Sequence, residues 1–190
     1  MRKFIDDMFN LVRLRVYTLD NYQYPFWQPA LVLTLLGLVS AAGAEGFTAN
    51  LGVRIAFFVL LNWVETLLFV GFLSWWLKRV GWKPPLPLFA LVVMSNAPQL
   101  LSPLTSWLPE SIAQLILLLL ALLCVVILVH ALSSISRLPR LRILLGMVLF
   151  TPLAFVILLV LLQVAQSNHW LAMENNAARD KNIAQGVDTP

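Results

Sequence analysis

Long apolar runs, separated by short polar stretches, make up most of this chain from about residue 26 onward. Each run is close to the roughly 20 residues that an α-helix needs to cross a bilayer. The runs cover residues 26–44, 53–77, 86–108, 111–136 and 141–166. Because the polar connections are short, consecutive helices are expected to lie antiparallel. The pattern predicts an all-α fold, a polytopic membrane bundle of five transmembrane helices.

The first 20 residues follow a different pattern, which predicts an amphipathic helix. Apolar residues recur there at helical spacing, and polar residues occupy the opposite side. The apolar positions are Phe4, Ile5, Met8, Phe9, Val12, Val16 and Leu19. We expect this helix to lie in the headgroup plane on the cytoplasmic side, as a topology anchor or as a docking surface for a soluble partner. Residues 21–166 form the predicted transmembrane domain, and residues 167–190 form a polar C-terminal tail.

The third run is the least regular, because polar residues and prolines interrupt it in the stretch VVMSNAPQLLSP at residues 92–103. The distribution of basic residues nevertheless favours a full crossing. If this run crosses, 10 of the 13 lysines and arginines lie on one side of the membrane, as the positive-inside rule requires. That side is then cytoplasmic and holds the N-terminus, and the C-terminus is outside.

Composition agrees with a membrane environment, since 60% of the residues are hydrophobic and 12% are charged, against about 25% charged in a soluble domain. The basic residues lie beside the runs, where they attract anionic headgroups. They form no basic face with interleaved aromatic residues, so no nucleic acid partner is expected. The expected partners are the lipid bilayer, other membrane proteins and a second copy of the chain.

Common enzyme signatures are missing from the sequence, which contains no HExxH, GxSxG, CxxC or glycine-rich phosphate loop. A metal site needs three or four convergent ligands, and the runs do not offer them. We therefore predict no catalytic residue, no metal and no cofactor. Intramembrane chemistry by Glu65 with an unknown partner stays open.

Polar residues in the second and third runs form a candidate intramembrane polar site, made of Asn62, Glu65, Ser95, Asn96, Pro98 and Gln99. Asn62 and Glu65 are three positions apart and share a helix face. A carboxylate facing lipid at mid-membrane costs several kcal/mol, so Glu65 is expected to face the bundle. Since no basic residue lies at its depth, we expect Glu65 to be protonated or hydrogen-bonded rather than ion-paired. Pro98 removes a helical hydrogen bond and predicts a broken helix, whose midpoint residue Asn96 meets Glu65.

Two interpretations of this polar set remain open. It is either structural, holding the helices together, or a site for a ligand, proton or ion. Interhelical hydrogen bonds in membranes contribute only about 0.6 kcal/mol each on average, which is a weak reason to bury a carboxyl group.

The order of features around the third run carries a resemblance. The linker LKRVGWK precedes the interrupted stretch SNAPQLLSPL, and two long Leu/Val runs follow it. This order resembles the Yip family of small five-span membrane proteins over about residues 54–166, most specifically at Ala97 and Pro98. The resemblance implies a five-helix bundle with a cytoplasmic N-terminus and, for a bacterial-type member, an inner-membrane location. Eukaryotic relatives associate with prenylated Rab GTPases and with each other, and the family supplies no catalytic residue.

The expected function is that of a non-enzymatic integral membrane protein, which acts as an organiser or accessory subunit through helix-face contacts with membrane proteins or lipids. The alternative is a small transporter or channel-like protein with a polar mid-membrane site around Glu65 and Asn96. An odd number of spans weighs against this alternative, because five helices do not divide into two equal repeats.

Overall fold

The computed structural model describes residues 2–44, 50–84 and 88–168, and the regular elements within these ranges are helices. In chain order they are α1 (Arg2–Val12), the 3₁₀ helix η1 (Leu19–Tyr22), α2 (Trp27–Ala42), α3 (Leu51–Arg79), α4 (Phe89–Ser95), the 3₁₀ helix η2 (Ala97–Trp107), α5 (Glu110–Ser136) and α6 (Arg140–Ser167). The all-α class is confirmed. The predicted polar tail from residue 169 onward and the start of the third run at residues 86 and 87 lie outside the described residues.

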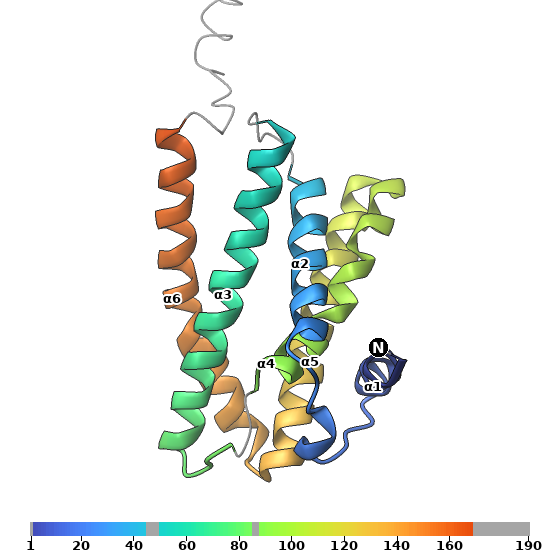
Figure 1. Ribbon diagram of the computed structural model, residues 1–190, viewed down its shortest axis with the longest axis vertical. Helices are drawn as coiled ribbons and strands as arrows, with labels where there is room; N and C mark the ends of the chain where they lie inside the picture. Colours follow the sequence, from blue (N-terminus) through green and yellow to red (C-terminus); the bar gives the residue numbers. More distant parts are fainter. Residues whose placement is uncertain (1, 45–49, 85–87, 169–190) are drawn as a thin grey trace, which may run out of the picture.

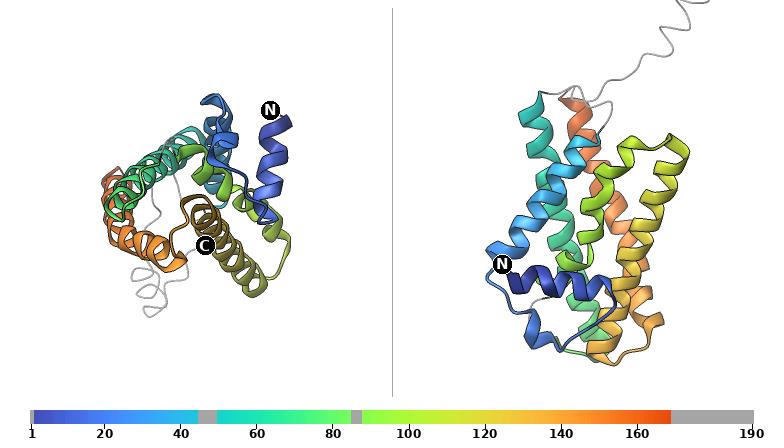
Figure 2. Two further views of the ribbon diagram at one scale, coloured as in Figure 1. Left: turned by 90° about the horizontal axis from the view of Figure 1, so that it is seen from below. Right: turned by 90° about the vertical axis from the view of Figure 1, so that its right-hand side faces the viewer.

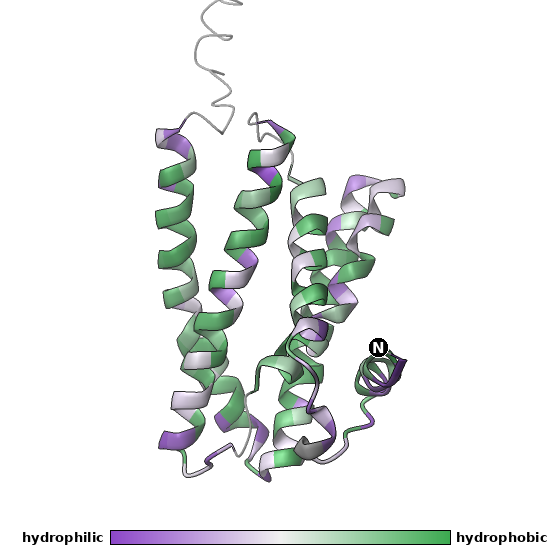
Figure 3. Cartoon of the chain, in the orientation of Figure 1, coloured by the Kyte–Doolittle hydropathy of each residue, from purple (hydrophilic) through white to green (hydrophobic). Residues whose placement is uncertain are grey.

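Within the described ranges, three helices are long and apolar enough to cross a membrane, namely α3, α5 and α6, with 27 to 29 residues each. At 1.5 Å per residue each is about 40 Å long, which exceeds the roughly 30 Å hydrocarbon core. Helix α2 is also apolar but has 16 residues, or about 24 Å. Figure 3 shows hydrophobic residues along most of the length of the three long helices.

The third apolar run is not one α-helix, because α4 ends at Ser95 and the chain continues as η2. Pro98 has no amide hydrogen for the carbonyl four residues earlier, and its ring disfavours helical geometry at Ala97. The break falls at Asn96, whose own amide still donates to the carbonyls of Val92 and Val93 at 3.3 and 3.2 Å. The 11 residues of η2 are an unusually long 3₁₀ segment, since such helices seldom exceed one or two turns.

The long helices run side by side along the longest axis of the molecule, and α1 lies across them (Figures 1 and 2). Helix α2 packs mainly on α3, and α5 packs mainly on η2. The α2–α3 contact is close at Gly37, where an added Cβ would lie 2.6 Å from the Cα of Val59. A larger residue at Gly37 would push the two backbones apart.

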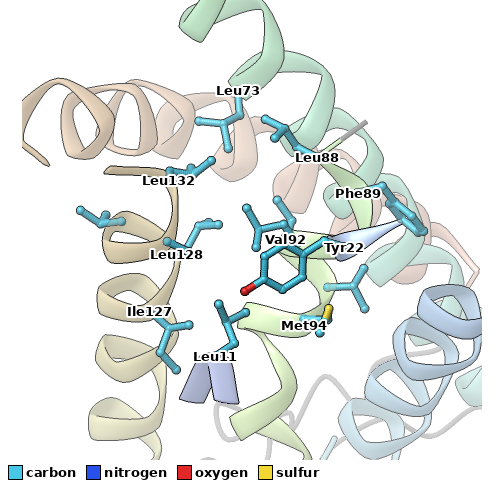
Figure 4. Packing of buried hydrophobic residues seen from close by; sticks show 14 of the residues in the cluster. Leu11, Tyr22, Leu73, Leu88, Phe89, Val92, Met94, Ile127, Leu128 and Leu132 are labelled. Carbon is cyan, nitrogen blue, oxygen red and sulfur yellow. The ribbon is translucent and has the colours of Figure 1, made fainter. Parts of the chain in front are cut away.

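Most of the buried core lies in one half of the bundle. We call the end formed by Lys78, Arg79, Arg137 and Arg140 the basic end, which is the lower end in Figure 1. The core takes residues from the half of each long helix nearest this end, including Leu73 and Leu77 of α3, Ile127 to Val129, Ala131 and Leu132 of α5, and Ile143 of α6, and it includes Leu91 to Met94 of α4. Figure 4 shows Tyr22 among Leu11, Val92 and Leu128 in this core. The basic end is therefore tightly packed.

The outer surface of α5 and α6 is strongly apolar. Large side chains exposed there include Leu115, Leu118 and Leu122 of α5 and Leu149, Phe155 and Val160 of α6. An apolar surface of this extent is not tolerated in water by a monomeric protein. It is the surface expected of an integral membrane protein that contacts lipid.

Helix α1 is shorter than the 20 residues that the amphipathic pattern predicted, because it ends at Val12. Leu14 adopts a left-handed conformation with φ of 59°. The amide of Leu14 donates to the carbonyl of Leu11 at 2.9 Å, and that of Arg15 to the carbonyl of Asn10 at 2.8 Å. These two bonds form a Schellman motif, which terminates a helix.

Candidate functional site

Glu65 is the middle residue of the 29 in α3. The residue is exposed, and it also lines a cavity inside the bundle, so it faces the bundle on one side only. It lies between two cavities, one inside the bundle and one between α3 and α6. Among the described residues the Glu65 carboxylate accepts no hydrogen bond and forms no ion pair.

The inner cavity brings together four of the six predicted polar residues, namely Asn62, Glu65, Asn96 and Gln99. It has a volume of about 290 Å³, and we call it the central cavity. Its apolar wall consists of Phe69, Val92, Ala121, Cys124, Val125, Leu128, Met147 and Phe150. The central cavity therefore places one carboxyl, three amide and one hydroxyl side chain, that of Thr66, opposite a wall of apolar side chains.

The remaining two predicted residues, Ser95 and Pro98, affect the backbone of α4 and of the break that follows it. Ser95 is fully buried, and its hydroxyl donates to the carbonyl of Leu91 at 2.8 Å. Pro98 is buried and ends α4 as described above. Neither residue lines the central cavity.

Asn62 has partners outside the cavity. Its amide donates to the carbonyl of Phe58 at 3.0 Å and to the hydroxyl of Ser40, on α2, at 3.4 Å. This second contact fits the structural interpretation, since it joins two helices. No hydrogen bond between Glu65 and Asn96 is present in the described part of the chain, although both line the central cavity.

Two further cavities lie in a row between the central cavity and the end of the bundle opposite the basic end. A cavity of about 280 Å³ shares Gln99 and Ala121 with it. A cavity of about 700 Å³ lies at that far end, and it shares Ser40, Ser102 and Leu117 with the cavity of about 280 Å³. Because neighbouring cavities share wall residues, they adjoin one another, and we call the row of three cavities the distal cleft. It runs from Gly43, Leu108 and Glu110 at its mouth to Glu65.

Comparisons with protein-family models, with curated proteins and with solved structures give no match. The function is therefore inferred from the chemistry of the site itself.

Several residues of the site were not predicted from the sequence. Phe69 lies four positions after Glu65 and thus on the same face of α3, so helical spacing could have placed it at the site. Ser40, Cys124 and Phe150 come from three other helices whose apolar pattern has no preferred face. Their presence at the site depends on how the helices pack.

The charge of Glu65 is not balanced by a basic side chain of the same helix. Arg54 lies 11 positions earlier in α3, which is about 16 Å along the axis. The Nε atom of Arg54 is itself buried without a hydrogen-bond partner among the described residues. The central cavity thus combines an acidic group with neutral neighbours.

Proposed function

We propose that this chain is a small transporter-like or channel-like protein of a bacterial inner membrane, in which the distal cleft gives a solute access to Glu65. The protein has five crossings, a cytoplasmic basic end and a distal mouth on the periplasmic side. It belongs in this proposal to the Yip family, and it acts without catalysing a covalent reaction.

The observation that carries this proposal is the distal cleft ending at an unpaired carboxyl group in mid-membrane. Ionisable residues at this depth are costly and usually mark pathways for ions or substrates. If Glu65 served only to hold helices together, it would be expected to hydrogen-bond a neighbouring helix, and no such bond is present among the described residues. The hydroxyl groups of Ser40 and Ser102 and the amide group of Gln99 line the distal cleft and supply polar contacts for the solute.

Five crossings are supported by the length of the irregular third segment. With rises of about 1.5 and 2 Å per residue, α4 and η2 would together extend about 32 Å if collinear, close to the thickness of the hydrocarbon core. A crossing there also keeps the basic residues beside α3 and α5 on one side, in agreement with the positive-inside rule.

Cysteine accessibility in membrane vesicles tests the cleft. In a Cys124→Ala background, single variants Ser40→Cys and Gln99→Cys are exposed to a membrane-impermeant maleimide. Both are expected to react from the side opposite the basic end, and Leu118→Cys, which lies on the lipid-facing surface at 59% exposure, serves as the unreactive control. If Gln99→Cys stays unmodified from both sides while folding normally, no aqueous passage reaches Glu65.

The accessory role expected from the sequence is a second candidate, favoured by the outer groove between α3 and α6. This groove of about 220 Å³ contains Glu65, Thr151 and Ala154, and small residues let another transmembrane helix approach closely. Cysteine cross-linking of Ala154→Cys in membranes tests it. A cross-linked partner or dimer at Ala154, absent for Leu118→Cys, would support the accessory role.

A further inference from the structure

We propose that the central cavity binds a small organic ammonium ion, a monovalent cation with alkyl substituents. This inference rests on the proposed function of the distal cleft and names the class of solute that the site accepts. It follows from the charge, the wall chemistry and the size of the cavity.

The charge of the site matches a single positive charge. Glu65 and Cys124 are the two ionisable side chains among the residues that line the central cavity, and no lysine, arginine or histidine lines it. An anionic solute would therefore meet a carboxylate without a compensating positive charge, which is unfavourable in a medium of low dielectric constant. A monovalent cation supplies the partner that Glu65 lacks.

The wall chemistry separates an organic cation from a metal ion. A divalent cation such as Ca²⁺ takes six to eight oxygen ligands, whereas the cavity supplies a single carboxyl group and eight of its 13 lining residues are apolar. The rings of Phe69 and Phe150 lie at the wall with centroids 5.0 Å apart and planes inclined by 63°. Alkylated ammonium ions are attracted to aromatic faces, and this attraction grows when the ion is desolvated.

The size of the cavity limits the solute to a small one. A volume of about 290 Å³ is near the lower end of the roughly 300 to 1,000 Å³ typical of ligand sites. The mouth of the cleft contributes Glu110, an exposed acid whose carboxylate accepts a hydrogen bond from Gln114 at 3.2 Å. A negative group at the entrance raises the local concentration of cations.

Calorimetric titration of the protein in lipid nanodiscs with benzyltrimethylammonium tests this inference. We expect saturable binding that Glu65→Gln weakens about 30-fold, as for the loss of one partner of a close charge pair. Phe150→Leu keeps the wall apolar but removes a ring, and it is expected to weaken binding about threefold. Glu110→Gln, outside the central cavity, is the matched control and should change the affinity little.

Benzyl alcohol and benzenesulfonate are the neutral and anionic probes in the same experiment. Equal binding of benzyl alcohol, or unchanged affinity in Glu65→Gln, would show simple partition into an apolar space and overturn the inference. If Glu65→Gln does not fold, Phe150→Leu and the two control probes still decide the outcome. If the ammonium probe does not bind while the maleimide still labels Gln99→Cys, the solute class is refuted and the proposed function is not. If the maleimide does not label Gln99→Cys, the proposed function itself is refuted.

Discussion

The hydroxyl of Tyr24 donates a hydrogen bond to the carboxylate of Asp7, and this contact joins α1 to the segment between η1 and α2. The ring of Tyr24 also packs edge-on against Phe4, with centroids 4.9 Å apart. The ammonium group of Lys3 lies 5.9 Å from the centroid of the same ring. Tyr24 thereby holds the inner face of α1 on the packed basic end.

Replacing Tyr24 by phenylalanine should loosen α1. Asp7 is buried, so Tyr24→Phe leaves its carboxylate without this donor at a cost of about 1 to 3 kcal/mol in the free energy of unfolding. Hydrogen exchange of the α1 amides and thermal unfolding in nanodiscs measure the effect. Tyr17→Phe is the control, because the Tyr17 side chain is exposed. Equal exchange in both variants would contradict this role of Tyr24.

Stability should also fall in strongly alkaline solution. Burial, and next the hydrogen bond to Asp7, raise the pKa of Tyr24 well above its ordinary value of 10.0. Below pH 10 the tyrosine is protonated in the folded and unfolded states, and the stabilisation is complete. As the pH rises above 10, the unfolded state loses its proton first, so unfolding becomes more favourable.

Unfolding followed from pH 8 to 12 checks this prediction. In Tyr24→Phe the decline above pH 10 should be shallower, although a part remains because burial also raises the pKa of Tyr22. An identical decline in the variant would assign the effect to other groups.

Close packing of α3 on α6 depends on Gly146. A Cβ at this position would lie 2.4 Å from the Cδ1 atom of Trp76, whose Nε1 donates to the carbonyl of Arg142 at 3.0 Å. Gly146→Ala should therefore displace the indole and lower stability by about 1 to 3 kcal/mol.

Gly71→Ala is the matched control in a helix interior, because an added Cβ there meets nothing within 4 Å. It should leave stability unchanged or raise it by up to about 1 kcal/mol through helix propensity. Thermal unfolding of the two variants in the same lipid compares them. If both alanines had the same effect, Trp76 would not be tightly held.

The break at Asn96 should depend on Pro98. Pro98→Ala restores a backbone donor and removes a constraint of about 3 kcal/mol on α-helix continuation, so α4 is expected to extend and to rotate Gln99 away from its present direction. Reduced maleimide labelling of Gln99→Cys in this background measures the change. Pro103→Ala, at an exposed position within η2, should leave labelling nearly unchanged. Undiminished labelling in Pro98→Ala would mean that packing alone holds the break.

The sequence by itself determined those features of the protein that depend on local chemistry. Apolar runs located the long helices, because an uncharged stretch of that length is stable as a helix in lipid. Pro98 located the break in the third run, since a missing amide hydrogen acts wherever the chain folds. Glu65 was recognised as unusual from its depth alone.

Tertiary structure decided which residues meet. The long helices are apolar on all sides, so no polar face tells which side of α5 or α6 turns toward α3. The exposure of Glu65, the gathering of Asn96, Gln99 and Phe150 around it, and the cleft in one half of the bundle therefore follow from packing. The end of α1 at Val12 was also not predicted, because the left-handed conformation of Leu14 is unusual for a leucine.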